Sequence, residues 1–136
     1  MAATLSACAS ARSTGRDYSA AGRHELAVQY YAHAFVESPK SDGTKAEFQR
    51  ALDLATRQLD SEYDKAKQSN HHRKAYAIAV RKAELMRWAY KLRLDGVDPA
   101  SSAALVEKSR KQARREAVAL VDEAEENNTA PKKLLQ

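Results

Sequence analysis

The stretch from Gly22 to Pro39 constrains the fold of this chain more than any other part of the sequence. A glycine opens it, a proline closes it, and the residues between them have the pattern of one amphipathic helix. Ala27, Tyr31 and Ala34 are spaced four and three residues apart, which places them on one helix face. Small residues on that face let a neighbouring backbone come close, and the tyrosine ring fills the remaining space. We therefore expect this helix to pack against another helix rather than to hold a reactive group.

The composition agrees with a helical protein. A length of 136 residues corresponds to one domain or to part of one. The chain has only 4 Gly and 3 Pro, with abundant Ala, Leu, Glu, Lys and Arg, which indicates an all-α fold. No stretch is long and apolar enough to span a bilayer. The formal net charge of +5 permits anionic partners without requiring them. The single cysteine excludes an internal disulfide and a metal site built from cysteines.

Together with the residues before it, the Gly22–Pro39 stretch resembles a tetratricopeptide repeat (TPR). The residues at the family's characteristic positions are Gly15, Tyr18, Gly22, Ala27, Tyr31, Ala34 and Pro39, in unbroken spacing. Ala11, Thr14 and His24 replace the family's Trp, Leu and second Tyr. The resemblance implies that Gly15 and Ala27 permit close approach of two helices, that Gly22 supports the turn, and that Pro39 ends the second helix. The alternative is an ordinary helical hairpin with a chance match.

The rest of the chain continues the helical pattern. Thr44 and Glu47 form a capping box, which predicts a helix start at Thr44. The helix that follows has an apolar stripe made of Phe48, Ala51, Leu52, Ala55, Leu59, Tyr63 and Ala66. The next helix, at about residues 73–94, has a stripe made of Ala75, Ala79, Ala83, Met86 and Tyr90, broadened by Tyr76, Val80 and Trp88. These two helices align with a second repeat only in degenerate form.

The last predicted helix begins at Pro99, after the capping residue Asp98. Its stripe consists of Val106, Ala113, Ala117, Leu120, Val121 and Ala124. Residues 127–131 read as a break, and residues 132–136 as the start of another helix.

The expected architecture is an all-α fold of about five helices, in which antiparallel hairpins stack as a TPR-like right-handed solenoid. The helical domain is expected at residues 9–127, with a clear repeat at 9–39, a longer degenerate hairpin at 44–94 and a C-terminal helix at 99–127. Residues 128–136 are expected to be a linker or the start of a further helix.

The N-terminus contains a second resemblance. Residues Leu5 to Cys8 resemble a bacterial lipobox, in which the cysteine sulfur receives a diacylglyceryl group. Residues 1–8 would then be the remnant of a lipoprotein signal peptide, although the charged and apolar segments of such a peptide are not seen ahead of the motif. This interpretation implies a lipid on Cys8 and a place in the bacterial cell envelope, as an outer-membrane lipoprotein on the periplasmic side. The alternatives are a free cysteine and a cytoplasmic protein.

The resemblance to TPR proteins implies a scaffold that holds a partner peptide or helix in a groove lined by the first helix of each pair. Arg12, Arg16 and Ser19 would face that groove, and the two arginines favour an acidic partner. An equally open alternative is that these arginines are only solvated. No catalytic motif and no cofactor-binding motif is present, so we expect neither an enzyme nor a bound cofactor.

Two further features of the sequence bear on function. The basic cluster Lys108, Arg110, Lys111, Arg114 and Arg115 allows binding to nucleic acid or to another anionic surface. It contains no stacking aromatic residues, so nucleic acid is the less favoured partner. Adjacent His71 and His72 lack the converging third and fourth ligands that a zinc site needs, so no metal site is expected.

Overall fold

The computed structural model describes the backbone of residues 2–94 and 97–134, and the side chains of residues 11–94 and 97–128. Within these ranges it contains no strand and five helices: α1 (Ala2–Ala20), α2 (His24–Glu37), α3 (Asp42–Gln68), α4 (His72–Lys91) and α5 (Pro99–Leu134). The predicted all-α fold of about five helices is confirmed.

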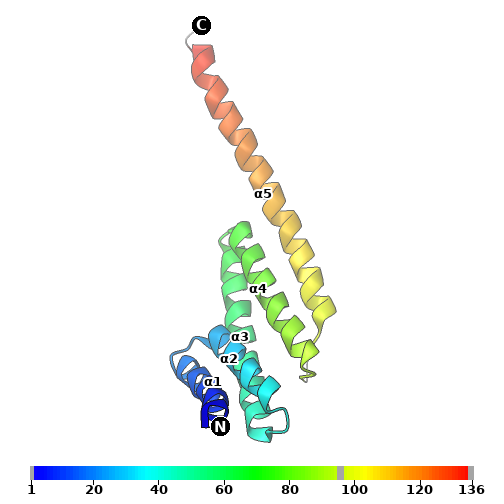
Figure 1. Ribbon diagram of the computed structural model, residues 1–136. Coiled ribbons are helices and arrows are strands. Elements are labelled where there is room, and N and C mark those ends of the chain that lie inside the picture. The colour runs from blue at the N-terminus through cyan, green and yellow to red at the C-terminus, as the bar shows by residue number, and fades with distance from the viewer. Residues whose placement is uncertain (1, 95–96, 135–136) are drawn as a thin grey trace.

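The helices pack in the order of the chain. Each one lies against the next, and α2 also touches α4 (Figure 1). The first half of α5 lies along α4, whereas its second half projects past the turn between α3 and α4 (Figure 1). The molecule is therefore a row of antiparallel helices with one long helical extension.

Three of the helices, α1, α3 and α4, end in the same backbone conformation. The chain takes a left-handed conformation after three of the described helices, with φ of +76° at Gly22 and of +56° at Asn70 and Arg93. In each turn the next N–H donates to the carbonyl five residues earlier, from Arg23 to Tyr18, from His71 to Ala66 and from Leu94 to Ala89. Gly22 adopts this conformation without steric cost, which explains why a glycine suits the α1–α2 turn.

The start of α3 differs from the prediction. Ser41 is the N-cap, and its hydroxyl oxygen accepts a hydrogen bond of 3.3 Å from the Thr44 N–H. The helix therefore begins at Asp42, two residues before the predicted start. Thr44 lies inside the helix, where its hydroxyl is 3.0 Å from the Ser41 hydroxyl. Glu47 is not used in a capping box, because its carboxylate faces α1 instead.

The core is built from alanine-rich helix faces. The whole predicted stripe of α3 is buried, from Phe48 to Ala66. It meets Ala27, Val28 and Tyr31 of α2 in the same buried cluster, together with Ala75, Ile78, Ala79, Leu85 and Ala89 of α4. Alanines let the helix axes approach closely, and the larger side chains fill the gaps between them.

Two expectations about the later helices were wrong. Trp88 and Tyr90, assigned to the apolar stripe of α4, are 57% and 63% exposed. The predicted stripe of α5 is partly covered only at Val106 and Ala113, and every residue from 117 to 128 is exposed. These residues lie where no neighbouring helix of the described chain covers them.

The predicted end of the last helix was also wrong. The helix does not stop at residue 127, because α5 continues without a break to Leu134 and includes Pro131. A proline within a helix removes one N–H donor, but the hydrogen bonds of the neighbouring turns can persist.

Candidate functional site

The hairpin of α1 and α2 supports the candidate site. Gly15 is buried beneath the ring of Tyr31, where an added Cβ would lie 3.1 Å from the Cδ1 and Cε1 atoms of that ring. Ala27 and Ala34 are almost fully buried beside Tyr31. Gly15 and Tyr31 thus lie at the contact between the two helices, and Ala27 and Ala34 are buried on the same face of α2 as Tyr31.

The other three repeat-packing residues lie towards the ends of the hairpin. Tyr18 is half-buried and stacks on Tyr30 with 5.3 Å between ring centroids. Gly22 lies in the turn, and Pro39 is exposed just after the end of α2 at Glu37. Pro39 therefore follows the second helix of the hairpin and is open to solvent.

Arg12 and Arg16 of α1 both bind Glu47 of α3. The two arginines are four residues apart, so their side chains leave the same face of α1. The Arg12 Nη2 atom is 3.0 Å and the Arg16 Nη2 atom 2.7 Å from the Glu47 Oε1 atom. Arg12 Nε also donates to Glu47 Oε2 at 3.2 Å. Two guanidinium groups thus share one carboxylate and link α1 to α3.

The shared carboxylate is strongly held in its charged form. Partial burial alone would raise the pKa of Glu47, but the hydrogen bonds and charges of Arg12 and Arg16 outweigh it, so that pKa lies below its usual value. The same contact raises the pKa of Arg16. Burial, followed by the negative charge of Glu47, raises the pKa of Tyr31, which lies beneath the cluster. All three groups are therefore in fixed charge states near neutral pH.

A hollow opens beside this cluster. It is lined by Arg16, Ser19, Ala20, His24, Tyr31, Glu47, Arg50, Ala51 and Leu54. Arg50 is exposed and forms no ion pair with any residue that the structure describes. Arg12, Arg16 and Arg50 carry three positive charges against the one negative charge of Glu47, a local balance of +2. We name this surface the α1–α3 face.

The structure brings the three predicted groove residues to the α1–α3 face. Arg16 and Ser19 line the hollow, and Arg12 adjoins it through Glu47. Sequence reasoning missed Glu47, Arg50 and Leu54 as members of this face. The sequence assigned Glu47 to a helix cap. Its pairing with Arg12 and Arg16 became visible only when the structure placed α3 beside α1.

The sequence also raised a lipidation site, a metal site and a membrane span. The backbone of Cys8 belongs to α1, but its side chain lies outside the described residues, so lipidation stays a prediction. Within the described part of the chain, no group of three His, Cys, Asp or Glu residues could hold a metal ion. None of the described helices is long and apolar enough to cross a membrane.

The basic cluster of α5 is exposed. Arg110 binds Glu107 one turn earlier, with 2.7 Å between Nη2 and Oε1. Lys111, Arg114 and Arg115 form no ion pair with the residues described here, and they lie beside Val118 and Asp122 on the surface.

Comparisons of this chain with family models, with curated proteins and with solved structures found no match.

Proposed function

We propose that this chain is a TPR-like scaffold that binds an acidic segment of a partner protein on the α1–α3 face. The observation that carries the proposal is that Arg12 and Arg16 share the Glu47 carboxylate, while Arg50 lines the same hollow without an ion-pair partner in the described chain. In this proposal the hairpins form a right-handed solenoid, and α1 and α3 are the first helices of successive repeats, which line the groove in that family.

Binding would use charge and apolar contact together. The Arg16 side chain is 56% exposed, so it can turn from Glu47 towards a partner carboxylate and bind it in a bidentate manner. Arg50 offers a second guanidinium across the hollow, and Ser19 offers a hydroxyl. Tyr31 and Leu54 supply an apolar floor for the aliphatic part of the partner residue. An acidic side chain or a free C-terminal carboxylate fits this set of donors.

A binding role suits the face better than acid–base catalysis. Glu47 is the carboxylate that lines the hollow, and Arg12 and Arg16 lower its pKa. A carboxylate that is ionised and fully engaged by two arginines is a weak proton donor and a weak base near neutral pH. We therefore propose a non-catalytic protein.

A charge reversal at Arg50 tests the proposal. Arg12 and Arg16 also hold α1 to α3, so changing them would mix binding with stability, whereas Arg50 stands apart from this contact. The probe is a fluorescently labelled oligoglutamate peptide with a free C-terminal carboxylate, measured by anisotropy. Arg50→Glu should weaken binding about tenfold or more, the size of one charged hydrogen-bonding contact.

The matched control is Arg73→Glu, which makes the same change of charge at an exposed position in the first turn of α4. It should leave the affinity within about twofold of the wild type. Equal affinities of the two variants would show that only the net charge of the protein attracts the peptide, and the assignment of the α1–α3 face would then be wrong.

Two further parts of this proposal rest on sequence features. The lipobox-like residues 5–8 support attachment of a lipid to Cys8 and a place in the bacterial cell envelope, with a cytoplasmic protein as the alternative. Mass spectrometry of the protein from its native membrane fraction would detect the added acyl mass on the peptide that contains Cys8. An unmodified cysteine in that fraction would contradict lipid anchoring.

A second candidate function is binding to nucleic acid or to another anionic surface through α5. The observation that favours it is the exposure of Lys111, Arg114 and Arg115 without ion-pair partners in the described chain. An electrophoretic shift assay with duplex DNA and with RNA at physiological salt tests it, because such binding depends on phosphate contacts. Absence of a shift with either probe would exclude the nucleic-acid form.

A further inference from the structure

A groove between α2 and α4 has no covering element in the described chain. Its floor consists of Val28, Ala32 and Leu85, all buried. Two large apolar side chains flank this floor and remain open to solvent, Val36 at 55% exposed and Trp88 at 57% exposed. Exposed tryptophans beside apolar grooves are typical anchors of protein–protein contacts.

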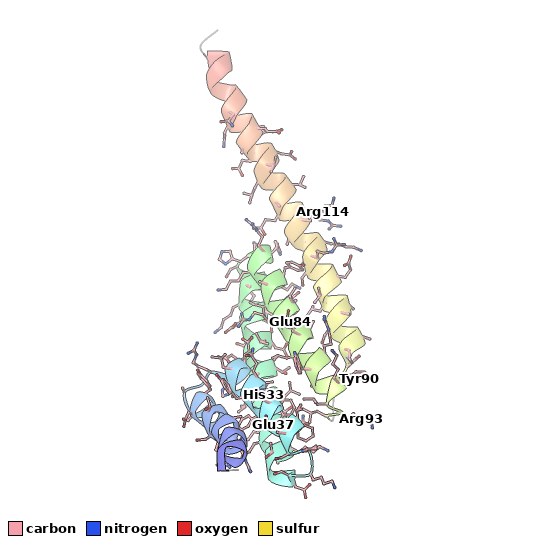
Figure 2. All side chains as sticks on the ribbon, viewed as in Figure 1. His33, Glu37, Glu84, Tyr90, Arg93 and Arg114 are labelled. Atoms are coloured by element: carbon pink, nitrogen blue, oxygen red, sulfur yellow. The ribbon has the colours of Figure 1, made fainter. Side chains whose placement is uncertain are left out.

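Of the charged side chains beside this groove, some form ion pairs and one does not. Arg81 donates hydrogen bonds to Glu25 and also lies 3.8 Å from Glu62, so these charges satisfy one another. Glu84 lies one turn before Trp88, is exposed, and forms no ion pair with the described residues. Figure 2 shows Glu84 on α4 and His33 on the neighbouring α2, where both line the groove. The groove thus has an apolar floor and a negative charge without an ion-pair partner at its α4 side.

The projecting half of α5 has the complementary character. Among its described residues, the large apolar side chains that are exposed are Val118, Leu120 and Val121, at 54%, 50% and 57% exposure. Ala117 and Ala124 lie on the same helix face as Leu120, at spacings of three and four residues. Arg114 precedes Ala117 by three residues and stands beside this face where α5 leaves the other helices (Figure 2).

We propose that the projecting half of α5 from one copy of the chain docks into the α2–α4 groove of a second copy. The small side chains of Ala117 and Ala124 allow the helix to approach α2 and α4 closely. Leu120 and Val121 then pack against Val36 and Trp88. Arg114 then pairs with Glu84. The acidic residues Asp122 and Glu126 are each two residues beyond a residue of the apolar face, which directs them to the opposite side of the helix, towards solvent.

The dimensions agree with this arrangement. Residues 113–128 span about 24 Å at 1.5 Å per residue, and the 14 residues of α2 span about 21 Å. The α2 residues that line the groove, Glu25 to Val36, span about 18 Å at the same rise, so the helix segment is long enough to cover the groove along α2. The α5 helix presents this segment away from its own α2–α4 groove (Figure 1).

The contact joins two different surfaces, so it is heterologous. After one such contact, one copy still has a free groove and the other still has a free α5, so association continues head to tail unless a ring closes. An interface formed by one short helix falls at the small end of specific interfaces, roughly 1,200 Å² of total buried surface or less. We expect association in the micromolar range, with an average mass that rises with protein concentration.

Sedimentation velocity with charge-reversal variants of the full chain tests the proposal. Glu84→Lys makes the groove positive, and Arg114→Glu with Arg115→Glu makes the projecting helix negative. Each variant alone should associate at least tenfold more weakly than the wild type. An equimolar mixture should associate again, because the positive groove of the Glu84→Lys variant attracts the negative helix of the other variant. The unchanged α5 of the Glu84→Lys variant can also bind the unchanged groove of the other variant, as in the wild type.

Asp64→Lys, an exposed charge reversal on α3, is the matched control and should associate like the wild type. Trp88→Ala removes the proposed anchor without a change of charge and should also weaken association. Circular dichroism establishes that each variant is folded. A wild-type chain that stays monomeric at high micromolar concentration, or a mixture that fails to restore association, would overturn the proposal and leave the groove to a different partner.

Discussion

Gly15 lies so close beneath Tyr31 that a methyl group at position 15 would stand 3.1 Å from two ring carbons. This distance is shorter than an ordinary carbon–carbon contact. The ring is 4% exposed and has little room to move, so the spacing of α1 and α2 depends on the absence of a side chain at residue 15.

Gly15→Ala should therefore destabilise the protein. The substitution gains about 1 kcal/mol of helix propensity but overpacks the contact by about 1–3 kcal/mol, which leaves a net loss of about 1 kcal/mol. The measurement is urea denaturation followed by circular dichroism. Gly43→Ala is the control, because its new Cβ would lie 2.8 Å from the Arg12 Nη2 atom, the end of a long side chain that can shift and still reach Glu47. That variant should be neutral or slightly more stable, and equal losses in both variants would contradict the role of Gly15.

Gly22→Ala should also destabilise the protein, for a different reason. Nothing lies within 4 Å of the position that its Cβ would take, so no clash arises. The backbone at residue 22, however, has a φ of +76°, which costs an L residue about 1–2 kcal/mol. We expect a loss of about 1 kcal/mol in the free energy of unfolding. An unchanged midpoint of urea denaturation would show that the turn relaxes without cost.

Glu47→Gln should affect stability and binding in opposite directions. The amide keeps the shape of the side chain but loses the charge that Arg12 and Arg16 share, so stability should fall by about 1 kcal/mol. The freed arginines should bind the oligoglutamate peptide several-fold more tightly. Weaker or equal peptide binding by this variant would contradict competition between Glu47 and an acidic partner.

The stability difference between the wild type and Glu47→Gln should also depend on pH. The pKa of Glu47 is lowered in the folded protein, so its contribution is present above the unfolded-state pKa of an ordinary carboxyl group. That contribution decreases as the pH falls through the folded-state pKa. The two proteins should therefore differ in stability at neutral pH and converge in acid. A difference that grows on acidification would have the wrong sign.

A buried hydrogen bond joins α3 to α5, with 2.9 Å between the Tyr63 hydroxyl and the Ser109 hydroxyl. Tyr63→Phe leaves Ser109, which is 1% exposed, without this partner, and should cost about 1–3 kcal/mol. Ser109→Ala should cost a similar amount. The double variant should lose less than the sum of the two, as measured by a double-mutant cycle in urea. Strict additivity would show that the two hydroxyl groups do not stabilise each other.

Local patterns in the sequence were sufficient to predict the helices. The periodicity from Phe48 to Ala66 identified the buried face of α3, and the Gly22–Pro39 stretch identified α2 and the turn before it. These signals succeed because hydrogen bonding, turn geometry and helical spacing act between residues a few positions apart. The same reasoning placed Arg12 and Arg16 on one face of α1, since that requires only a spacing of four.

The tertiary structure alone decided which of these faces are covered and which charges are paired. Trp88, Leu120 and Val121 have the spacing of core residues, yet they are exposed because no helix of the described chain covers them. Glu47 has a local pattern typical of a helix cap, yet it binds two arginines more than thirty residues earlier in the chain. Amphipathic spacing shows that a helix has an apolar side, but covering that side depends on where distant segments lie.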